Sequence, residues 1–175
     1  RAAHVAERGG RGLLEELGRR DDWEELRVYG ALLLVGTELF NHPKVHYLSG
    51  FFGPIERGLR DAGANISFVP ADFRRFAPLL EEQSPRVMAT AAAPPDADGW
   101  CSLSLHAGGT TTEMRRAADD PERLLIVEVS GRFPRPSGLL PHYRHALHLD
   151  QLAAAGVLVL LDDLVRSRLE RGDAE

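Results

Sequence analysis

Apolar runs with the length of buried strands alternate with segments of helical periodicity along this chain. The clearest runs are 26–35, 87–92 and 124–129, and a helical repeat of leucines lies at 11–20. Strands covered on both faces form nearly continuous apolar runs rather than alternating patterns. Such strands alternating with helices predict an α/β fold with an open, mostly parallel sheet and helices on both faces.

The same patterns place the elements. They predict helices over 11–20, 54–62, 72–82 and 111–118, and strands over 26–35, 45–48, 66–69, 87–92, 101–106 and 124–129. Pro54 suits the first turn of a helix, and Gly63 suits its end. Three prolines and two glycines make 131–144 a predicted loop. Residues 157–161 are predicted as a strand or a short helix, with a charged helix following to about residue 171.

Composition excludes several classes of protein. A chain of 175 residues with 43% hydrophobic residues can bury a full core. Its formal net charge of −5 argues against a nucleic-acid partner, because phosphate binding requires a basic surface. The longest apolar run, 152–161, is far shorter than the ~20 residues of a membrane-spanning helix.

The chain starts with Arg1 rather than Met, so we expect it to be a piece of a longer protein. It begins without the apolar core of a signal peptide. Cys101 is its single cysteine, which excludes an internal disulfide and suits a reducing cytoplasm.

The loop 49–57 is the first candidate site. Gly50 and Gly53 would let the backbone approach a ligand, and the following helix offers free N–H groups. Arg57 would lie one turn into that helix. The loop is either a site for a thioester carbonyl or a nucleotide phosphate, or a tight turn that uses glycine for its geometry.

The second candidate is a proline corner at 93–105. Pro94 and Pro95 remove two backbone donors, so the chain cannot continue as a central strand there. Asp96 can accept bonds from the N–H groups ahead of it, and Gly99 can supply a positive φ. Asp96 is therefore a catalytic acid or a turn-former, and the spacing favours the turn.

Three further patterns are weaker. Residues 106–112 are either an anion site or an N-capped helix start without a P-loop lysine. His142, His145 and His148 recur every three residues but lack a carboxylate at a matching interval for a metal site. Cys101 has no evident base beside it, which favours a small core residue over a nucleophile.

Four motifs in order resemble the acetyl-CoA hydrolase / 4-hydroxybutyrate CoA-transferase family, within the class I CoA-transferases. The family's F-x-G-x-x-x-R corresponds to 51–57, and its aromatic-aliphatic-Pro to 68–70. Its S-P-P-D-x-x-G-x-x-S-L-G corresponds to 93–104, and its E-V-N-x-x-M-P to 128–134. The resemblance covers about residues 10–150 and implies a CoA-transferase or NagB-RpiA-like fold.

The chain departs from the family pattern at several loop positions. Ser104 replaces the last glycine of S-L-G, and Ser130 replaces the asparagine of E-V-N. Ile55 or Glu56 stands where an asparagine is common in the first loop. The segment 138–148 also looks longer than the usual connection.

The resemblance implies that the parent protein transfers CoA between acyl groups, or hydrolyses acyl-CoA, and that this chain is its N-terminal half. In the family a glutamate of the C-terminal half attacks the acyl-CoA, and a glutamyl-CoA thioester follows. No glutamate here lies in the matching motif, so we expect no catalytic nucleophile in this chain and no activity of the isolated half. The substrate- or CoA-binding residues that the resemblance implies are Phe52, Gly53, Arg57, Pro95 and Gly99.

Backbone N–H groups near Gly53 would contact the thioester carbonyl, and Arg57 would either contact CoA phosphates or remain a solvated helix residue. The implied partners are acyl-CoA, small carboxylates of acetate-type metabolism and the C-terminal half. Coenzyme A would be a substrate, with no permanently bound cofactor and no metal. We expect no nucleic acid and no membrane partner, and a cytoplasmic protein that can self-associate into a homo-oligomer.

Residues 1–150 would form the CoA-transferase-type domain, with 151–175 as a C-terminal extension or the start of a linker. A rival interpretation follows from the lost asparagine and glycine residues. A diverged α/β domain could bind a CoA-like ligand or a partner without turnover.

Overall fold

The structure is a computed structural model that describes residues 2–4, 11–105, 108–136, 138–140, 143–153 and 157–161. The chain divides into two compact units, Arg1–Met88 and Ala89–Glu175. The predicted boundary after residue 150 stays a prediction.

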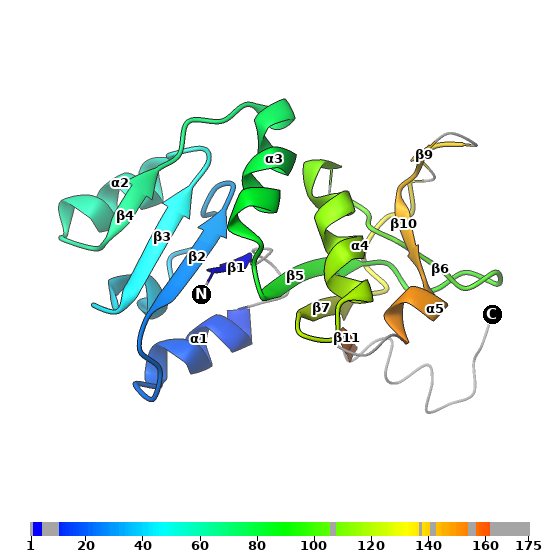
Figure 1. Cartoon of the computed structure of the whole chain (residues 1–175), viewed down its shortest axis with the longest axis horizontal. Helices are drawn as coiled ribbons and strands as arrows, with labels where there is room; N and C mark the ends of the chain where they lie inside the picture. The colour runs from blue at the N-terminus through cyan, green and yellow to red at the C-terminus, as the bar shows by residue number, and fades with distance from the viewer. Residues whose placement is uncertain are drawn as a thin grey trace. The chain divides into compact units, whose positions relative to one another are not determined.

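The first unit is built on parallel strands. Its elements are β1 (Ala2–His4), α1 (Arg11–Arg19), β2 (Leu26–Gly30), the 3₁₀ helix η1 (Glu38–Asn41), β3 (Val45–Ser49), α2 (Pro54–Asp61), β4 (Ile66–Phe68) and α3 (Phe73–Gln83). The strands lie in the order β1-β2-β3-β4 (Figure 1). Val28 pairs with Tyr47, and Tyr47 pairs with Ile66. The parallel pairing places the carboxyl ends of β2, β3 and β4 at one edge.

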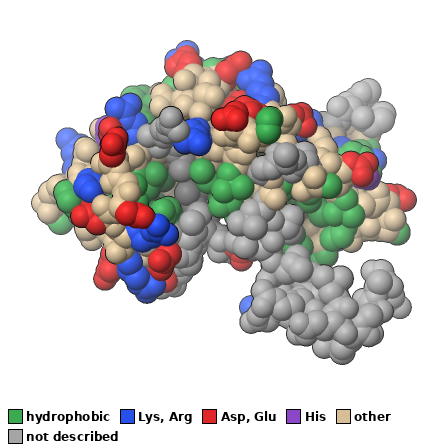
Figure 2. Space-filling model, turned by 60° about the horizontal axis from the view of Figure 1, so that its bottom comes forward, with side chains coloured by type: hydrophobic (Ala, Val, Ile, Leu, Met, Phe, Trp, Pro, Cys, Tyr) green, Lys and Arg blue, Asp and Glu red, His purple; other side chains and the backbone are tan. Residues whose placement is uncertain are grey.

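Charged side chains of both signs are scattered over the face drawn in Figure 2. Figure 2 shows acidic and basic groups intermixed on the visible face rather than gathered by sign. The sequence contains 21 Lys and Arg against 26 Asp and Glu.

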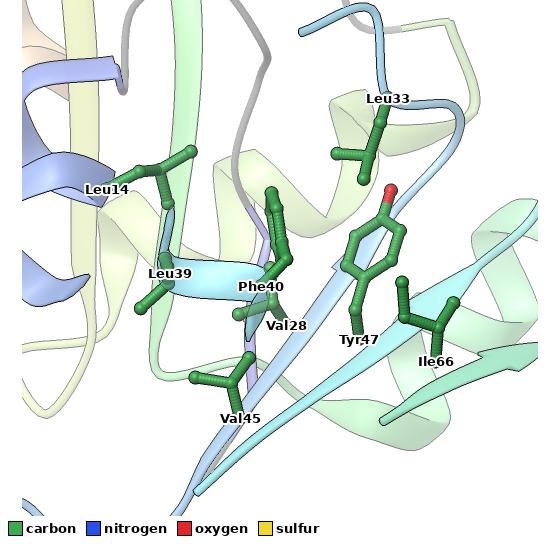
Figure 3. Close-up of a cluster of buried hydrophobic side chains, with 8 residues drawn as sticks. All are labelled: Leu14, Val28, Leu33, Leu39, Phe40, Val45, Tyr47 and Ile66. Carbon is green, nitrogen blue, oxygen red and sulfur yellow. The ribbon is translucent and has the colours of Figure 1, made fainter. Parts of the chain in front are cut away.

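Apolar side chains alternate between the two faces of the first unit's sheet, as expected for strands. On one face a buried cluster joins the strands to α1, η1 and α2 (Figure 3). Its members are Leu14, Val28, Leu33, Leu39, Phe40, Val45, Tyr47 and Ile66. On the other face Tyr29 packs against Phe76 and Leu80 of α3. Helices therefore cover both faces, which confirms the predicted architecture.

The second unit contains the remaining strands and helices. They are β5 (Val87–Ala92, whose first two residues belong to the first unit), β6 (Trp100–Ser102), the 3₁₀ helix η2 (Gly108–Thr110), α4 (Thr111–Asp119), β7 (Leu124–Val129), β8 (Gly138–Leu139), β9 (Tyr143–Arg144), β10 (Ala146–His148), α5 (Leu149–Leu152) and β11 (Val157–Leu161). β7 lies between β5 and β11 and is parallel to β11. Two short antiparallel pairs, β6 with β10 and β8 with β9, accompany this sheet.

Most predicted elements are confirmed, and three predictions need correction. The strand predicted over 26–35 ends at Gly30, because the chain beyond it turns to meet the start of α2. The strand predicted over 101–106 is only Trp100–Ser102. The predicted loop 131–144 contains the hairpin β8–β9.

Residues 157–161 form a strand rather than a helix, since β11 pairs with β7 over its whole length. The charged helix predicted beyond it falls outside the described residues. Within the described part of the chain, no helix has the length and apolar character needed to cross a membrane.

Candidate functional site

The turn between β3 and α2 holds the first group of predicted site residues. β3 ends at the buried Ser49, and Gly53 is the N-cap of α2 with Pro54 at its first position. Phe52, Gly53 and Arg57 therefore lie together at the start of α2. This start lies at the carboxyl edge of parallel strands, where ligands bind in open α/β sheets.

Glu56 organises this turn, although the sequence analysis gave it no role. Its side chain is fully buried. Oε1 accepts hydrogen bonds from the Leu33 N–H at 2.6 Å and the Ser49 hydroxyl at 3.2 Å. Oε2 accepts from the Gly53 N–H at 3.0 Å. One carboxylate thus joins the segment after β2, the end of β3 and the start of α2.

Close packing inside the protein explains the glycine at position 53. A Cβ there would lie 2.5 Å from Leu32 Cδ1 and 2.9 Å from Glu56 Oε2. Its φ of −87° is ordinary for any residue, so the constraint is steric rather than conformational. The Gly53 N–H, which we predicted as a donor to a substrate carbonyl, donates to Glu56 in this structure.

Phe52 and Arg57 have different surroundings. Phe52 is half-buried against the core cluster, with its ring centroid 5.9 Å from that of Phe68. The Arg60 guanidinium lies over the Phe52 ring at 5.8 Å from its centroid. Arg57 is exposed, and its Nε lies 3.4 Å from the Gly53 carbonyl oxygen.

The proline corner in the second unit holds Pro95 and Gly99. Pro95 forms an isolated antiparallel bridge with Cys101. Asp96 Oδ1 accepts from the Trp100 N–H at 2.8 Å and the Asp98 N–H at 3.1 Å. The Trp100 N–H bond is the main cause that lowers the pKa of the Asp96 carboxyl, with smaller effects of nearby arginines. Asp96 thus acts as a turn-former.

Arg135 holds the corner from the loop after β7. It donates to the carbonyl oxygens of Pro94 and Trp100, and its Nη2 lies 3.3 Å from Asp96 Oδ2. Gly99 has a φ of +81°, which favours glycine at this position. The corner is therefore a clamped hairpin turn, and the positions of Pro95 and Gly99 are explained by its backbone geometry.

Ser104 and Ser130, two of the departures from the family pattern, are both buried. Ser104 has a φ of +55°, in the left-handed region where glycine is favoured. Among the described residues, its buried hydroxyl has no hydrogen-bond partner. The Ser130 N–H donates to Ala92 O at the end of β5, and its hydroxyl accepts from the Arg132 N–H.

Cys101 and the two described histidines of the 142–148 pattern have local structural contacts. Burial raises the pKa of the Cys101 thiol to about 11, so the reactive thiolate is scarce at neutral pH. His145 Nε2 lies 3.1 Å from Ser104 O, and His148 Nε2 lies 3.0 Å from Asp98 O. His142 falls outside the described residues. Within the described ranges, no three His, Cys, Asp or Glu side chains gather as a metal site would require.

The segment 106–112 is described only from residue 108. Thr110 is the N-cap of α4, so the predicted helix start is confirmed. Residues 106 and 107, which the anion-site alternative needs, lie outside the described part.

Sequence reasoning missed Glu56 and Arg135. A glutamate three residues after an N-cap is a known helix-start signal, so Glu56 could have been found as a capping residue. Arg135 has no such signal, since it lies 41 residues from Pro94.

Comparison with known proteins supports the fold. No protein-family model matches the sequence, and no curated protein matches it. The solved structure of RipA from Yersinia pestis matches with a TM-score of 0.66 at 22% identity, over 91% of this chain and 38% of RipA. A 4-hydroxybutyrate CoA-transferase from Porphyromonas gingivalis matches with a TM-score of 0.54 at 13% identity, over 92% of this chain and 35% of that protein.

The chain therefore has a CoA-transferase-like fold. It spans little more than a third of the length of these two proteins. At such identities the likeness defines the fold, and the narrower family suggested by the motifs remains a prediction.

Proposed function

We propose that this chain is the N-terminal half of an acyl-CoA:carboxylate CoA-transferase or an acyl-CoA hydrolase. The observation that carries the proposal is the match of 92% of the chain to a 4-hydroxybutyrate CoA-transferase fold. The order of the four motifs supports it independently. The parent protein binds acyl-CoA and a small carboxylate, and coenzyme A is a substrate.

In this proposal a glutamate outside the chain is the nucleophile. Its carboxylate attacks the thioester carbonyl and releases CoA thiolate, which leaves a mixed anhydride. The thiolate then attacks the glutamyl carbonyl, releases the first carboxylic acid as its anion and forms the enzyme-CoA thioester. A second carboxylate or water completes transfer or hydrolysis, and exclusion of water favours transfer.

The chain contributes binding groups. Phe52 and Gly53 form the turn beside the thioester, and exposed Arg57 is available for the CoA phosphates. The Gly53 N–H already donates to Glu56 and is not free to bond the ligand. The turn therefore contacts the ligand through side chains and through van der Waals contact with the backbone.

Borohydride trapping tests the proposal on the full-length protein. Thioesters are reduced by borohydride, so incubation with acyl-CoA and then borohydride is expected to abolish transfer of CoA to acetate. Borohydride without acyl-CoA is the control and should leave activity intact. Undiminished turnover after both treatments would reject the glutamyl-thioester mechanism.

A non-catalytic binding domain is the second candidate. The internal bond of the Gly53 N–H and the serines at positions 104 and 130 favour it, because each changes a loop expected to face the ligand. Calorimetry distinguishes the candidates: this alternative expects saturable binding of acyl-CoA by the full-length protein with no turnover of the bound thioester.

A further inference from the structure

Large apolar side chains are exposed at the carboxyl edge of the first unit's sheet. Leu34 and Val35, in the segment after β2, are 57% and 48% exposed, and Phe68, at the end of β4, is 49% exposed. Phe52 lies between them in sequence and contacts Phe68 through its ring. β2, β3 and β4 are parallel neighbours (Figure 1). These residues therefore lie at or just beyond the carboxyl ends of three adjacent strands, at one edge of the sheet.

The segment after β2 runs beside the start of α2. A Cβ on Gly53 would meet Leu32 Cδ1, and one on Gly36 would lie 3.9 Å from Ile55 Cγ2. Leu34 and Val35 thus stand close to the turn that carries Phe52. We name Leu34, Val35, Phe52 and Phe68 the apolar edge.

Three polar donors beside the apolar edge are already bonded within the protein. The Glu56 carboxylate accepts from the N–H groups of Leu33 and Gly53 and from the Ser49 hydroxyl. A charged or hydroxylated group that bonded to these three donors would have to displace that buried carboxylate. An uncharged, apolar group makes no such demand.

Two exposed arginines of α2 lie close to this turn. Arg60 lies over the Phe52 ring, and Arg57 Nε faces the Gly53 carbonyl oxygen. Both are exposed, so their attraction for an anion is weakened by water and salt. Burial of apolar surface, by contrast, strengthens binding about fourfold for each methylene group.

We propose that the apolar edge receives the acyl group of the substrate and selects uncharged aliphatic acyl chains of several carbons over carboxylated ones. This inference rests on the proposed function and names its substrate class. Glu56 is a positioning residue in this arrangement, because it holds the turn and withholds its N–H donors from the ligand.

Unreactive thioethers of CoA test the proposal in the full-length protein without any need for turnover. Calorimetry would compare S-ethyl-CoA, S-butyl-CoA and S-(3-carboxypropyl)-CoA. We expect S-butyl-CoA, which has two more methylene groups, to bind about fifteenfold more tightly than S-ethyl-CoA, and the carboxylated thioether to bind more weakly than S-butyl-CoA. Equal affinities, or preference for the carboxylated thioether, would overturn the proposal.

Two exposed-site variants locate the effect. Phe68→Ser is expected to reduce the butyl-to-ethyl affinity ratio to about threefold or less. Leu139→Ser, at a residue of the other unit that is 76% exposed, is the matched control and should leave the ratio unchanged. An unchanged butyl-to-ethyl affinity ratio in Phe68→Ser would show that the apolar edge does not bind the acyl group. Failure of every CoA thioether to bind would instead reject the proposed function itself.

Discussion

Ser104 combines a left-handed backbone conformation with a buried side-chain hydroxyl. It adopts a φ of +55°, and its hydroxyl is buried without a partner among the described residues. The family that the motifs resemble has a glycine at this position, and a left-handed backbone conformation favours glycine. The serine therefore adds strain two residues after β6, and no bond within the described part of the chain compensates its hydroxyl.

Ser104→Gly is expected to stabilise the second unit by about 1 kcal/mol. Relief of the left-handed strain, about 1–2 kcal/mol, outweighs the added entropy of an unfolded glycine, about 0.5–1 kcal/mol. Urea denaturation would measure the change. Ser104→Ala is the control, since it removes the hydroxyl and keeps the strain. A less stable Ser104→Gly protein would show that the hydroxyl has a partner of its own.

Asp96→Asn is expected to lower the urea midpoint at pH 7 and to have no effect in acid. The folded pKa of Asp96 is lowered chiefly by the Trp100 N–H bond. A carboxyl with a lowered folded pKa stabilises the fold above its unfolded pKa of about 3.9, and the stabilisation is lost as the pH falls through the folded value.

Urea midpoints of the wild-type and Asp96→Asn proteins at pH 7 and below about pH 3 would check this dependence. Asp98→Asn is a matched control on the same turn and should change the pH 7 midpoint less. A gap between wild type and Asp96→Asn that persists unchanged in acid would contradict the electrostatic explanation.

At the scale of elements, ion pairs and clamps attach loops and helices to the strands. In the second unit, Glu113 of α4 pairs with Arg123 before β7 at 2.7 Å, and both side chains are almost fully buried. Arg116 approaches the other oxygen of Glu113 at 3.3 Å from an exposed position. The buried pair joins the start of α4 to the entry of β7.

Arg123→Ala is expected to destabilise the protein by about 3 kcal/mol, because it leaves the buried Glu113 carboxylate without its nearest cation. Arg116→Ala, which removes the exposed partner of the same carboxylate, should change stability by less than about 1 kcal/mol. Thermal or urea unfolding would measure both. Similar losses of stability in the two variants would show that the buried pair contributes no more to stability than the exposed pair.

The whole molecule carries a net negative charge with its signs intermixed. The charge is −5 over 175 residues, and the described side chains on the face drawn in Figure 2 form no large basic area. We expect the protein to pass through a heparin column at about 50 mM salt without retention, because a polyanion finds too few clustered cations. Retention that weakens steeply with added salt would point to a basic surface and revive a nucleic-acid partner.

Local chemistry made several parts of this fold predictable. The start of α2 at Pro54 and its end before Gly63, whose φ is +96°, follow from the backbone preferences of those two residues. The turn at Asp96 and Gly99 follows in the same way. Each depends on bonds between residues only a few positions apart, which a short stretch of sequence contains.

The candidate site was predictable only in outline. The sequence pointed to Phe52, Gly53 and Arg57 as one group, and the structure does bring them together at the start of α2. It did not reveal that Glu56 also accepts from the Leu33 N–H and the Ser49 hydroxyl, since those bonds depend on how the segment after β2 and the end of β3 pack against α2.

By itself the sequence determined the alternation of strands and helices, and with it the α/β class, because apolar periodicity records which faces are buried. Only the tertiary structure decided where the strand beginning at Leu26 stops. The apolar run continues to residue 35, but Leu33 turns its N–H to Glu56, 23 residues away. The hydrogen bond from Arg135 to the proline corner likewise depends on the tertiary structure, because it joins residues far apart in the sequence. Contacts between distant segments depend on how the chain packs, and no local pattern of residues encodes them.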